Sequence, residues 1–353
     1  MKLYKEVYRH AGSTTIKETF FNKDHKIAAV LDLYKAAETS GGDLTLYAYT
    51  GESYQLTRYK QDTNTYKRFL KEGVALFTNA NWYTTSEAHY QKDCKIDKGL
   101  LLEEHTHNFS YEEKHSVVYT YNKGLKVSEN SILADGTDIR INYVYDNKGL
   151  LLSRSTLKNN IFQDQVNYSY LTNGQLALEQ TFHSNKGQNF LAAEKKYHYN
   201  PKNQLEKTEY YGRYNGQLHL YKTEEEIRQN DLLTKKSAGI PAIDIAIGHY
   251  DLAAMHTYFR ENDMEGYIAY FDQDFTAKNP ITPHQHVVEK LDEQGNPVET
   301  HIMDPEKPEN QLTMAAYRNE YNEAGKLEFM ITYILNEQGQ MEENSIKKLY
   351  YLL

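Results

Sequence analysis

Two pairs of histidines are spaced as metal ligands on a β-strand would be. His105 and His107 are two residues apart, as are His284 and His286, and Glu289 follows the second pair. Alternate residues of a strand share one face, so either pair could offer two imidazole nitrogens to one metal ion. A metal site also needs a third ligand in a fixed geometry, and the sequence supplies no second spaced motif. The sequence therefore favours surface histidines, and we expect no metal and no other cofactor.

Clustered carboxylates are the second candidate for chemistry. Glu103 and Glu104 are adjacent, and residues 224–226 are all glutamates. A glycosidase needs two carboxyl groups about 5 to 9 Å apart across the bond that it breaks. Adjacent residues of a strand point to opposite faces, and a run of charges is typical of a solvated surface. No nucleophile elbow or phosphate-binding loop of known form is present, so we predict that the chain is not an enzyme.

Tyrosine is the most systematically placed residue, with 32 tyrosines against a single tryptophan. Four tyrosines recur in the same sequence context, at Tyr119, Tyr143, Tyr168 and Tyr197. If neighbouring units are in register, these rings line one face of a sheet and stabilise it by about 0.2 to 1 kcal/mol per cross-strand pair. An exposed ladder of this kind could also bind a sugar or a partner protein. The structural role is the favoured interpretation, and these four tyrosines are the candidate binding residues.

The tyrosines belong to a repeat with a period of 25 residues. Glycines stand at Gly99, Gly124, Gly149 and Gly174, and Asn203 takes the same place 29 residues later. Large side chains alternate with smaller ones before each glycine, which is typical of a strand, and glycine or asparagine suits a turn that ends in a left-handed conformation. The sequence therefore predicts a mainly all-β protein, an antiparallel meander of about 25-residue β-hairpins that forms an extended curved sheet.

The pattern is eroded before residue 93 and is interrupted once. We assign residues 1–221 to the hairpin repeats, with degenerate first units, and residues 263–353 to hairpins that continue the same sheet. Terminal units of a repeat protein diverge because they shield an open sheet edge. Residues 28–37 fit either a helix or a strand.

Residues 222–262 are predicted to be a helical insertion. Thr223-Glu224-Glu225-Glu226 resembles a capping box, and lysines at positions 235 and 236 suit the far end of a short helix. Apolar residues spaced by three and four predict a second helix over residues 241–260. The alternation of isoleucines at 243, 245 and 247 also fits a strand, so that alternative stays open.

Bulk composition excludes several classes of partner. The formal charge is −9 and there is no basic cluster, so a nucleic acid would be repelled. The single cysteine, Cys94, cannot form an intramolecular disulfide, and we expect a small, half-buried apolar side chain. There is no run of 18 apolar residues, and the amino terminus lacks the apolar core of a signal peptide. We therefore expect a cytoplasmic protein that does not bind membranes.

The repeat motif resembles the tyrosine-aspartate (YD) repeats of the bacterial RHS family. The full dipeptide is present in Tyr145-Asp146, and Tyr121-Asn122, Tyr199-Asn200 and Tyr321-Asn322 carry the close substitute. The resemblance covers most of the chain except residues 222–262. It implies a sheet wound from successive hairpins, which closes into a shell around a toxin domain in long members, and carbohydrate binding is also attached to the family name. This chain has too few units for such a shell.

These observations predict a noncatalytic binding protein. The expected role is that of an immunity or antitoxin protein, or of a scaffold, that contacts a protein partner through its sheet or its helical insertion. An acidic protein would suit a basic toxin as partner. The alternative is a carbohydrate-binding module that uses exposed tyrosines, and a third hypothesis is an enzyme with a site between residues 222–262 and the sheet.

Overall fold

The computed structural model describes residues 2–352 except residues 11, 23, 37–39, 62–87, 186, 215–216, 240–280 and 337. The described residues form β-strands, and none of them is helical. The strand pairs whose register the structure describes are all antiparallel. Apart from β1 with β22, they join strands that follow one another in the chain, for example β10 to β11 and β11 to β12. The predicted antiparallel meander of hairpins is therefore confirmed. The described part of the chain contains no helix with the length and apolar character needed to cross a membrane.

The chain divides into two compact units. Unit 1 comprises Met1–Thr120, Asn130–Thr137 and Ala315–Leu353, and unit 2 comprises Tyr121–Glu129 and Asp138–Met314. The strands that lie wholly or mostly in unit 1 are β1 (Lys2–His10), β2 (Ser13–Phe21), β3 (Ile27–Lys35), β4 (Ser40–Thr50), β5 (Ser53–Gln61), β6 (Ala88–Asp97), β7 (Leu100–Asn108), β8 (Glu113–Asn122), β20 (Gln311–Tyr321), β21 (Leu327–Leu335) and β22 (Met341–Leu352).

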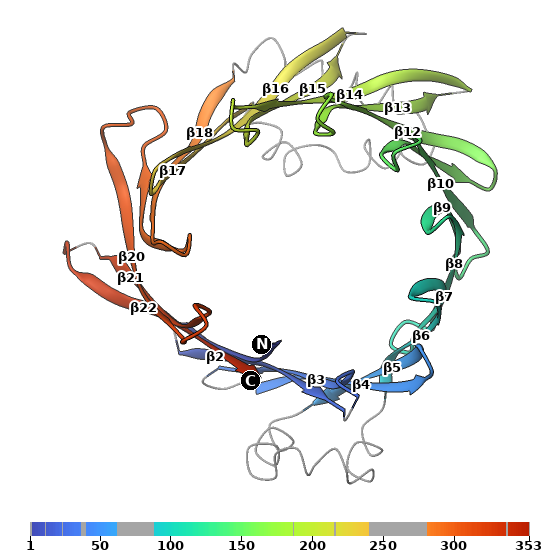
Figure 1. Ribbon diagram of the computed structural model, residues 1–353, viewed down its shortest axis with the longest axis horizontal. Helices are drawn as coiled ribbons and strands as arrows, with labels where there is room; N and C mark the ends of the chain where they lie inside the picture. The colour runs from blue at the N-terminus through green and yellow to red at the C-terminus, as the bar shows by residue number, and fades with distance from the viewer. Residues whose placement is uncertain are drawn as a thin grey trace. The chain divides into compact units, whose positions relative to one another are not determined.

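Unit 2 continues the same hairpin pattern. Its strands are β9 (Leu125–Ile132, of which the first part belongs to this unit), β10 (Asp138–Tyr145), β11 (Leu151–Lys158), β12 (Ile161–Tyr170), β13 (Leu176–Asn185), β14 (Gln188–Tyr199), β15 (Leu205–Tyr214), β16 (Gln217–Gln229), β17 (Leu232–Gly239), β18 (Thr282–Leu291) and β19 (Pro297–Met303). Figure 1 shows consecutive strands side by side within each unit.

An aspartate or asparagine at the start of the turn explains why this position recurs in the repeat. Oδ1 of Asp146 accepts hydrogen bonds from the backbone N–H groups of Lys148 and Leu150, each at 2.8 Å. Gly149 ends the turn at a φ of 84°, and Asn203 takes the equivalent place at 61°, as predicted. The same pair of hydrogen bonds is formed at Asn22, Asn200, Asp292, Asn322 and Asn336.

We expect Asp146→Ala to lower the free energy of unfolding by about 1 to 2 kcal/mol. Two hydrogen bonds to the turn are lost, and each contributes about 0.5 to 1.5 kcal/mol. The control is Lys148→Ala in the same turn, which keeps the backbone donor and should change stability by less than about 0.5 kcal/mol. Urea denaturation followed by circular dichroism measures both values. Equal losses in the two variants would contradict this account of the turn.

Two of the repeats turn more tightly than the sequence suggested. Lys98 and Gly99 both have positive φ, at 50° and 75°, and Lys123 and Gly124 do so at 51° and 80°. These two-residue loops need positive φ at both central residues to match the twist of the flanking strands. Glycine is the last loop residue in both kinds of turn, so the 25-residue spacing does not distinguish them.

Residues 222–239, the first part of the predicted helical insertion, form strands. β16 and β17 are joined at Asn230, which has a φ of 56°, and Glu226 lies opposite Lys235 in the register of this hairpin. The helix predicted to begin at Thr223 was therefore wrong. Its acidic residues instead face cations on the sheet, because the ladder between strands outweighs a local capping signal. The second predicted helix, over 241–260, lies outside the described residues.

The open edge expected at the terminal units was also wrong, because the first and last strands of the chain pair with each other. β1 pairs with β22 from Lys2 opposite Leu352 to His10 opposite Ser345, and it pairs with β2 on its other side. Figure 1 shows the two chain ends close together. Neither terminal strand is a free edge, so the terminal repeats do not need to shield one. Residues 28–37, left open between helix and strand, belong largely to β3.

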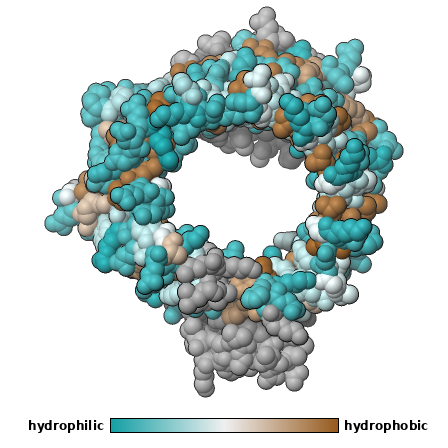
Figure 2. Space-filling view, viewed as in Figure 1, coloured by the Kyte–Doolittle hydropathy of each residue, from teal (hydrophilic) through white to brown (hydrophobic). Residues whose placement is uncertain are grey.

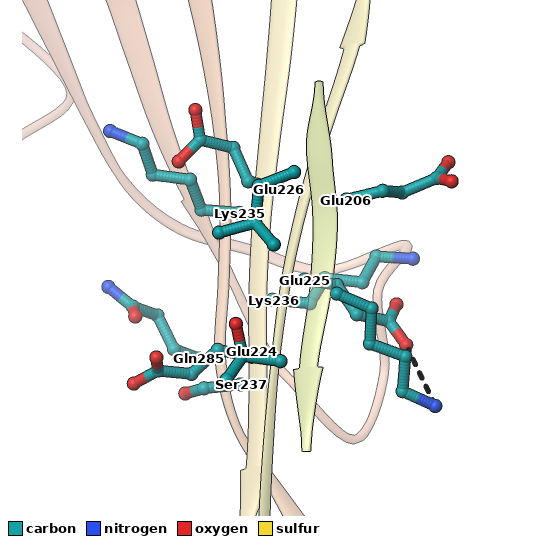
Figure 3. Close-up of a pocket in the computed structure, with 11 residues that line it drawn as sticks. Glu206, Glu224, Glu225, Glu226, Lys235, Lys236, Ser237 and Gln285 are labelled. Carbon is teal, nitrogen blue, oxygen red and sulfur yellow. Dashed lines mark ion pairs between the residues drawn. The ribbon is translucent and has the colours of Figure 1, made fainter. Parts of the chain in front are cut away.

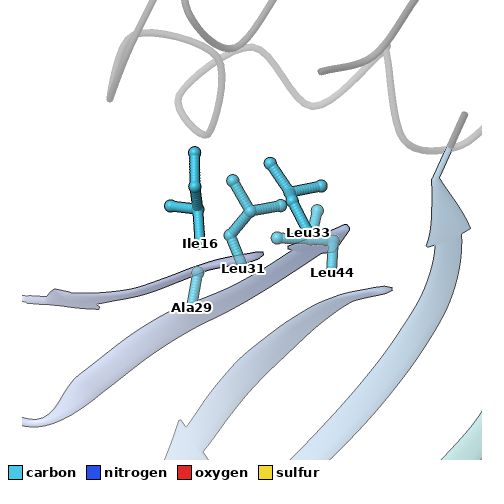
Figure 4. Close-up of a cluster of buried hydrophobic side chains, with 5 residues drawn as sticks. All are labelled: Ile16, Ala29, Leu31, Leu33 and Leu44. Atoms are coloured by element: carbon cyan, nitrogen blue, oxygen red, sulfur yellow. The ribbon is translucent and has the colours of Figure 1, made fainter. Parts of the chain in front are cut away.

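Buried apolar side chains are concentrated in one cluster of unit 1. Ile16, Ala29, Leu31, Leu33 and Leu44 project from β2, β3 and β4 to the same side of the sheet (Figure 4). Leu31 is 1% exposed and Leu44 is fully buried. Elsewhere in the described part of the chain most strand residues are only half-buried. The surface view agrees, because hydrophobic residues appear there as separate patches among hydrophilic ones (Figure 2).

Candidate functional site

Three of the first tyrosines of the repeat, and Tyr210 as well, each donate a hydrogen bond from the hydroxyl to a glutamate on a neighbouring strand. In unit 1, Oη of Tyr119 lies 2.8 Å from Oε2 of Glu104. In unit 2 the same contact joins Tyr143 to Glu129 at 3.1 Å, Tyr197 to Glu179 at 3.3 Å and Tyr210 to Glu224 at 2.6 Å. We call the six residues of unit 2 the tyrosine–glutamate row. Three of the four predicted tyrosines thus share one geometry.

Sequence reasoning named Glu104 and Glu224 only as members of charge runs, and it missed the pairing of these glutamates with tyrosines. Glu104 and Glu129 each stand five residues after a turn glycine, at Gly99 and Gly124, and Glu179 stands five residues after Gly174. Glutamate at a fixed offset in three repeats is a signal that the sequence already contained. Tyr210 and Glu224 lie outside the 25-residue spacing, so no such signal marked them.

The second tyrosine of each Tyr-x-Tyr pair has a structural role. The hydroxyl of Tyr145 donates a hydrogen bond to the backbone carbonyl of Lys126 at 2.9 Å, and that of Tyr170 donates one to the carbonyl of Leu151 at 2.8 Å. The equivalent bonds from Tyr199 and Tyr351 reach the carbonyls of Leu176 and Leu327. In each case the acceptor lies two residues after the turn glycine of the preceding hairpin. These hydrogen bonds therefore connect each hairpin to the preceding one.

Burial and hydrogen bonding fix the protonation of the tyrosine–glutamate contacts at neutral pH. Burial raises the pKa of Tyr143 and Tyr168, and burial together with the charge of Glu179 raises the pKa of Tyr197 to about 12. Burial alone would raise the pKa of Glu104, but hydrogen bonds from Lys92 and Tyr119 outweigh it and lower that pKa. The hydroxyls of Tyr143 and Tyr197 are therefore neutral donors at neutral pH. Glu104 is a charged acceptor, which makes its hydrogen bond from Tyr119 stronger than a neutral one.

Lysines form ion pairs with the glutamates of the row. Nζ of Lys126 lies 2.6 Å from Oε2 of Glu129 and 4.7 Å from the centre of the Tyr143 ring. Nζ of Lys195 lies 3.2 Å from Oε1 of Glu179. The charges of these glutamates are therefore compensated within the sheet, and at least one tyrosine ring is covered by a lysine. The four candidate tyrosines are half-buried.

His105 and His107 line a shallow pocket of about 420 Å³ in unit 1, next to Asp93 and Lys114. The carboxylate of Asp93 already accepts hydrogen bonds from the side-chain amides of Gln55 and Gln91. The ring of His107 packs against Phe109, with centroids 4.0 Å apart. Among the residues that the structure describes, no three histidine, cysteine, aspartate or glutamate side chains are placed to hold a metal ion.

The second histidine pair lies on β18 of unit 2. Burial, and then the charge of Lys236, lowers the pKa of His286, so this imidazole is neutral at neutral pH. It lines a pocket of about 260 Å³ together with Pro305 and Pro308. The carboxylate of Glu289 is engaged elsewhere, because it accepts a hydrogen bond from Lys235 at 2.9 Å. The structure therefore does not bring His286 and Glu289 together.

Four of the five clustered glutamates form ion pairs with lysines, and Glu224 does so with Lys222 of its own strand. Glu103 pairs with Lys95 on one face of the sheet and Glu104 with Lys92 on the other, as the alternation of a strand predicts. Glu224, Glu225 and Glu226 line a depression of about 230 Å³ over β15 to β18, together with Lys235 and Lys236 (Figure 3). The hydroxyl residues Thr208 and Ser237 line the same depression, and Ser237 lies opposite Glu224 in the register of β16 and β17. Residues 240–262 and any cleft beside them lie outside the described residues.

Cys94 is more completely buried than predicted. Its side chain is 3% exposed, and its Sγ lies 3.9 Å from Oε1 of Glu104. Burial raises the pKa of the thiol, which keeps it protonated at neutral pH. The residue therefore packs as a small apolar side chain.

Comparisons with known proteins give no family. No protein-family model and no curated protein matches the sequence. Among solved structures, porin-like proteins from Bacteroides uniformis ATCC 8492 and Bacteroides vulgatus ATCC 8482 align over 99% of this chain and 98% of theirs, at 9% identity and TM-scores of 0.28 and 0.22. The structure titled TcdB2-TccC3-TEV aligns over 96% of this chain and 21% of that chain, at 9% identity and a TM-score of 0.23. Similarities this low support no inference about the fold or function of this chain.

Proposed function

We propose that this chain is a noncatalytic binding protein, of the immunity or scaffold type, which contacts a protein partner through the tyrosine–glutamate row. The observation that supports the proposal most is the fixed orientation of Tyr143, Tyr197 and Tyr210, whose hydroxyls are held by glutamates on neighbouring strands. Tyrosines with few rotatable bonds give a large contact area at low entropic cost, and they are enriched in protein interfaces. The kinship with RHS repeat proteins belongs to the same proposal and is supported by the Tyr-x-Tyr-Asx turns.

The formal charge of −9 favours a basic partner, because long-range attraction speeds the encounter of oppositely charged proteins. Within the row itself the glutamates are already compensated by lysines. Charge would therefore act mainly on the rate of association, while the tyrosines would supply the contact. The expected signature is a complex whose association rate falls as salt concentration rises.

A carbohydrate ligand is the weaker alternative. Sugar-binding tyrosines stack an open ring face on the sugar, whereas Lys126 lies over the ring of Tyr143 at 4.7 Å. The hydroxyls of Tyr143 and Tyr197 are also engaged with glutamates rather than free for a sugar. These contacts favour a protein partner, which can pack around fixed polar side chains.

The test is a pairwise titration of the purified chain with each protein encoded beside it in its genome, measured by calorimetry. We expect one complex, and we expect Tyr143→Ala combined with Tyr197→Ala to weaken it at least about tenfold, as for tyrosines that dominate an interface. Tyr111→Ala is the control, because Tyr111 is 73% exposed and lies outside the row. Absence of any complex, or equal effects of both variants, would refute the proposal. A glycan array signal lost in the double variant would favour the carbohydrate alternative.

A further inference from the structure

Arg154 occupies the position that carries glutamate in neighbouring repeats. It stands five residues after Gly149, as Glu129 does after Gly124 and as Glu179 does after Gly174. In the register of β10 and β11 it lies directly opposite Tyr143, so it shares the face of the tyrosine–glutamate row. The row therefore has one cation where its pattern calls for an acid.

The guanidinium of Arg154 is incompletely satisfied. Its Nε is buried and has no hydrogen-bond partner. The nearest carboxylate oxygen, Oδ1 of Asp164, lies 3.9 Å from Nη2, beyond hydrogen-bond length. That oxygen already accepts a hydrogen bond from the hydroxyl of Thr156 at 3.1 Å. Nε itself is closed to solvent, but the side chain as a whole is 42% exposed, so a ligand can reach other parts of it.

Tyr168 supplies a second donor beside this guanidinium. Val166 lies opposite Arg154 in the register of β11 and β12, and Tyr168 is two residues further along the same face. Of the four candidate tyrosines, it alone makes no hydrogen bond through its hydroxyl to another described residue. Burial raises its pKa, the charge of Glu179 directly opposite it adds to this, and the charge of Arg154 acts in the other direction. Arg154 and Tyr168 thus present neighbouring donors without an acceptor.

The surroundings allow a single negative charge to approach. Asp164, Glu129 and Glu179 are the nearby acids, and Lys126 and Lys195 neutralise the two glutamates at 2.6 and 3.2 Å. The remaining acid, Asp164, faces Arg154 itself. An incoming carboxylate would therefore meet an arginine with free donors and little unpaired negative charge.

We infer that Arg154 and Tyr168 form a subsite for a carboxylate of the protein partner, either an aspartate or glutamate side chain or a chain terminus. The planar guanidinium can hold both oxygens of a carboxylate, and the tyrosine hydroxyl can donate to one of them. This inference rests on the proposed function, because it names one contact within the proposed interface. It predicts that an otherwise basic partner surface carries one acid in register with Arg154.

The subsite can be tested without the partner. The full chain, labelled at arginine with ¹⁵N, is titrated with the blocked tripeptide acetyl-Gly-Asp-Gly-amide and with its Asn counterpart, and the Nε–H signals are followed by NMR. We expect the Asp peptide to shift the Arg154 signal at millimolar concentration and to bind at least about tenfold better than the Asn peptide. Tyr168→Phe should weaken binding several-fold by the same signal. Arg154→Lys, which lacks that signal, is titrated by calorimetry and should also weaken binding because the bidentate contact is lost.

Arg228→Gln is the matched control, since Arg228 is an exposed arginine of unit 2 away from this site. Equal binding of the two peptides, or a response unchanged by Tyr168→Phe, would refute the subsite while leaving the proposed function standing. A glucuronate oligosaccharide that binds more than about tenfold better than the Asp peptide would overturn the assignment to a protein carboxylate. Unchanged amide spectra confirm that each variant remains folded.

Discussion

Replacing Leu44 by alanine is expected to lower the free energy of unfolding by about 2 to 5 kcal/mol. The side chain is fully buried and lies opposite Leu31 in the register of β3 and β4. Truncation removes its contacts and leaves a cavity, because neighbouring side chains fill it only in part. Such a loss is a large fraction of the about 5 to 15 kcal/mol by which native proteins are stable.

Urea denaturation followed by circular dichroism gives this difference. The matched control is Ile132→Ala, an aliphatic residue of unit 1 that is 50% exposed, for which we expect a change within about 0.5 kcal/mol. If both variants lose the same stability, the cluster of Leu44 is not the main apolar core of unit 1. The described strands elsewhere are half-buried, so few other single truncations should approach this effect.

Gly42→Ala is expected to be nearly as damaging, for a different reason. A Cβ at this position would lie 2.1 Å from the backbone carbonyl oxygen of Asp32 and 2.8 Å from Cα of Leu33. Both are backbone atoms, so the strain cannot be relieved by the rotation of a side chain. Overpacking of this kind costs about 1 to 3 kcal/mol and can cost more when strands must separate. Thermal unfolding should show a lower midpoint for this variant.

Gly174→Ala separates crowding from backbone strain. Gly174 has a φ of 86°, but nothing lies within 4 Å of a Cβ added there. Only the penalty of the left-handed conformation applies, which is about 1 to 2 kcal/mol. A Gly42→Ala variant that is no less stable than Gly174→Ala would show that β3 and β4 can move apart without loss.

The two proposals concern one face of unit 2 and make separate claims. The first concerns Tyr143 and Tyr197, which glutamates hold in place. The second concerns Arg154, whose Nε has no hydrogen-bond partner, and Tyr168 beside it. A partner that depends on the tyrosines but ignores Arg154 would preserve the first proposal alone. A partner that depends on both the tyrosines and Arg154 would show that this face is a contact surface and that it prefers a carboxylate at Arg154.

The candidate site could be predicted only in part. The spacing of Tyr119, Tyr143, Tyr168 and Tyr197 placed them in equivalent positions, and three of them do make the same contact with a glutamate. The glutamates were overlooked because each lies 14 to 18 residues before its tyrosine, on another strand. Cross-strand partners follow from register, which a list of residue types does not reveal.

The helix predicted from Thr223 failed for a related reason. Its acidic residues and lysines satisfy a local rule for helix termini, yet the same residues pair across the strands β16 and β17. A capping signal contributes about 1 kcal/mol, whereas a strand within a sheet gains a ladder of backbone hydrogen bonds on both sides. The neighbouring strands β15 and β18 supply that ladder.

The sequence alone determined that this chain doubles back at regular intervals, because turns such as those that begin at Asp146, Asn200 and Asn322 and end in a left-handed glycine or asparagine are specified within five residues. Only the tertiary structure decided that β1 pairs with β22, which brings together residues that are more than 330 positions apart. It also decided that Arg154 lies beside Tyr143 and Tyr168 on one face. Turn chemistry is local, whereas strand register and closure depend on side chains that meet only after the chain has folded.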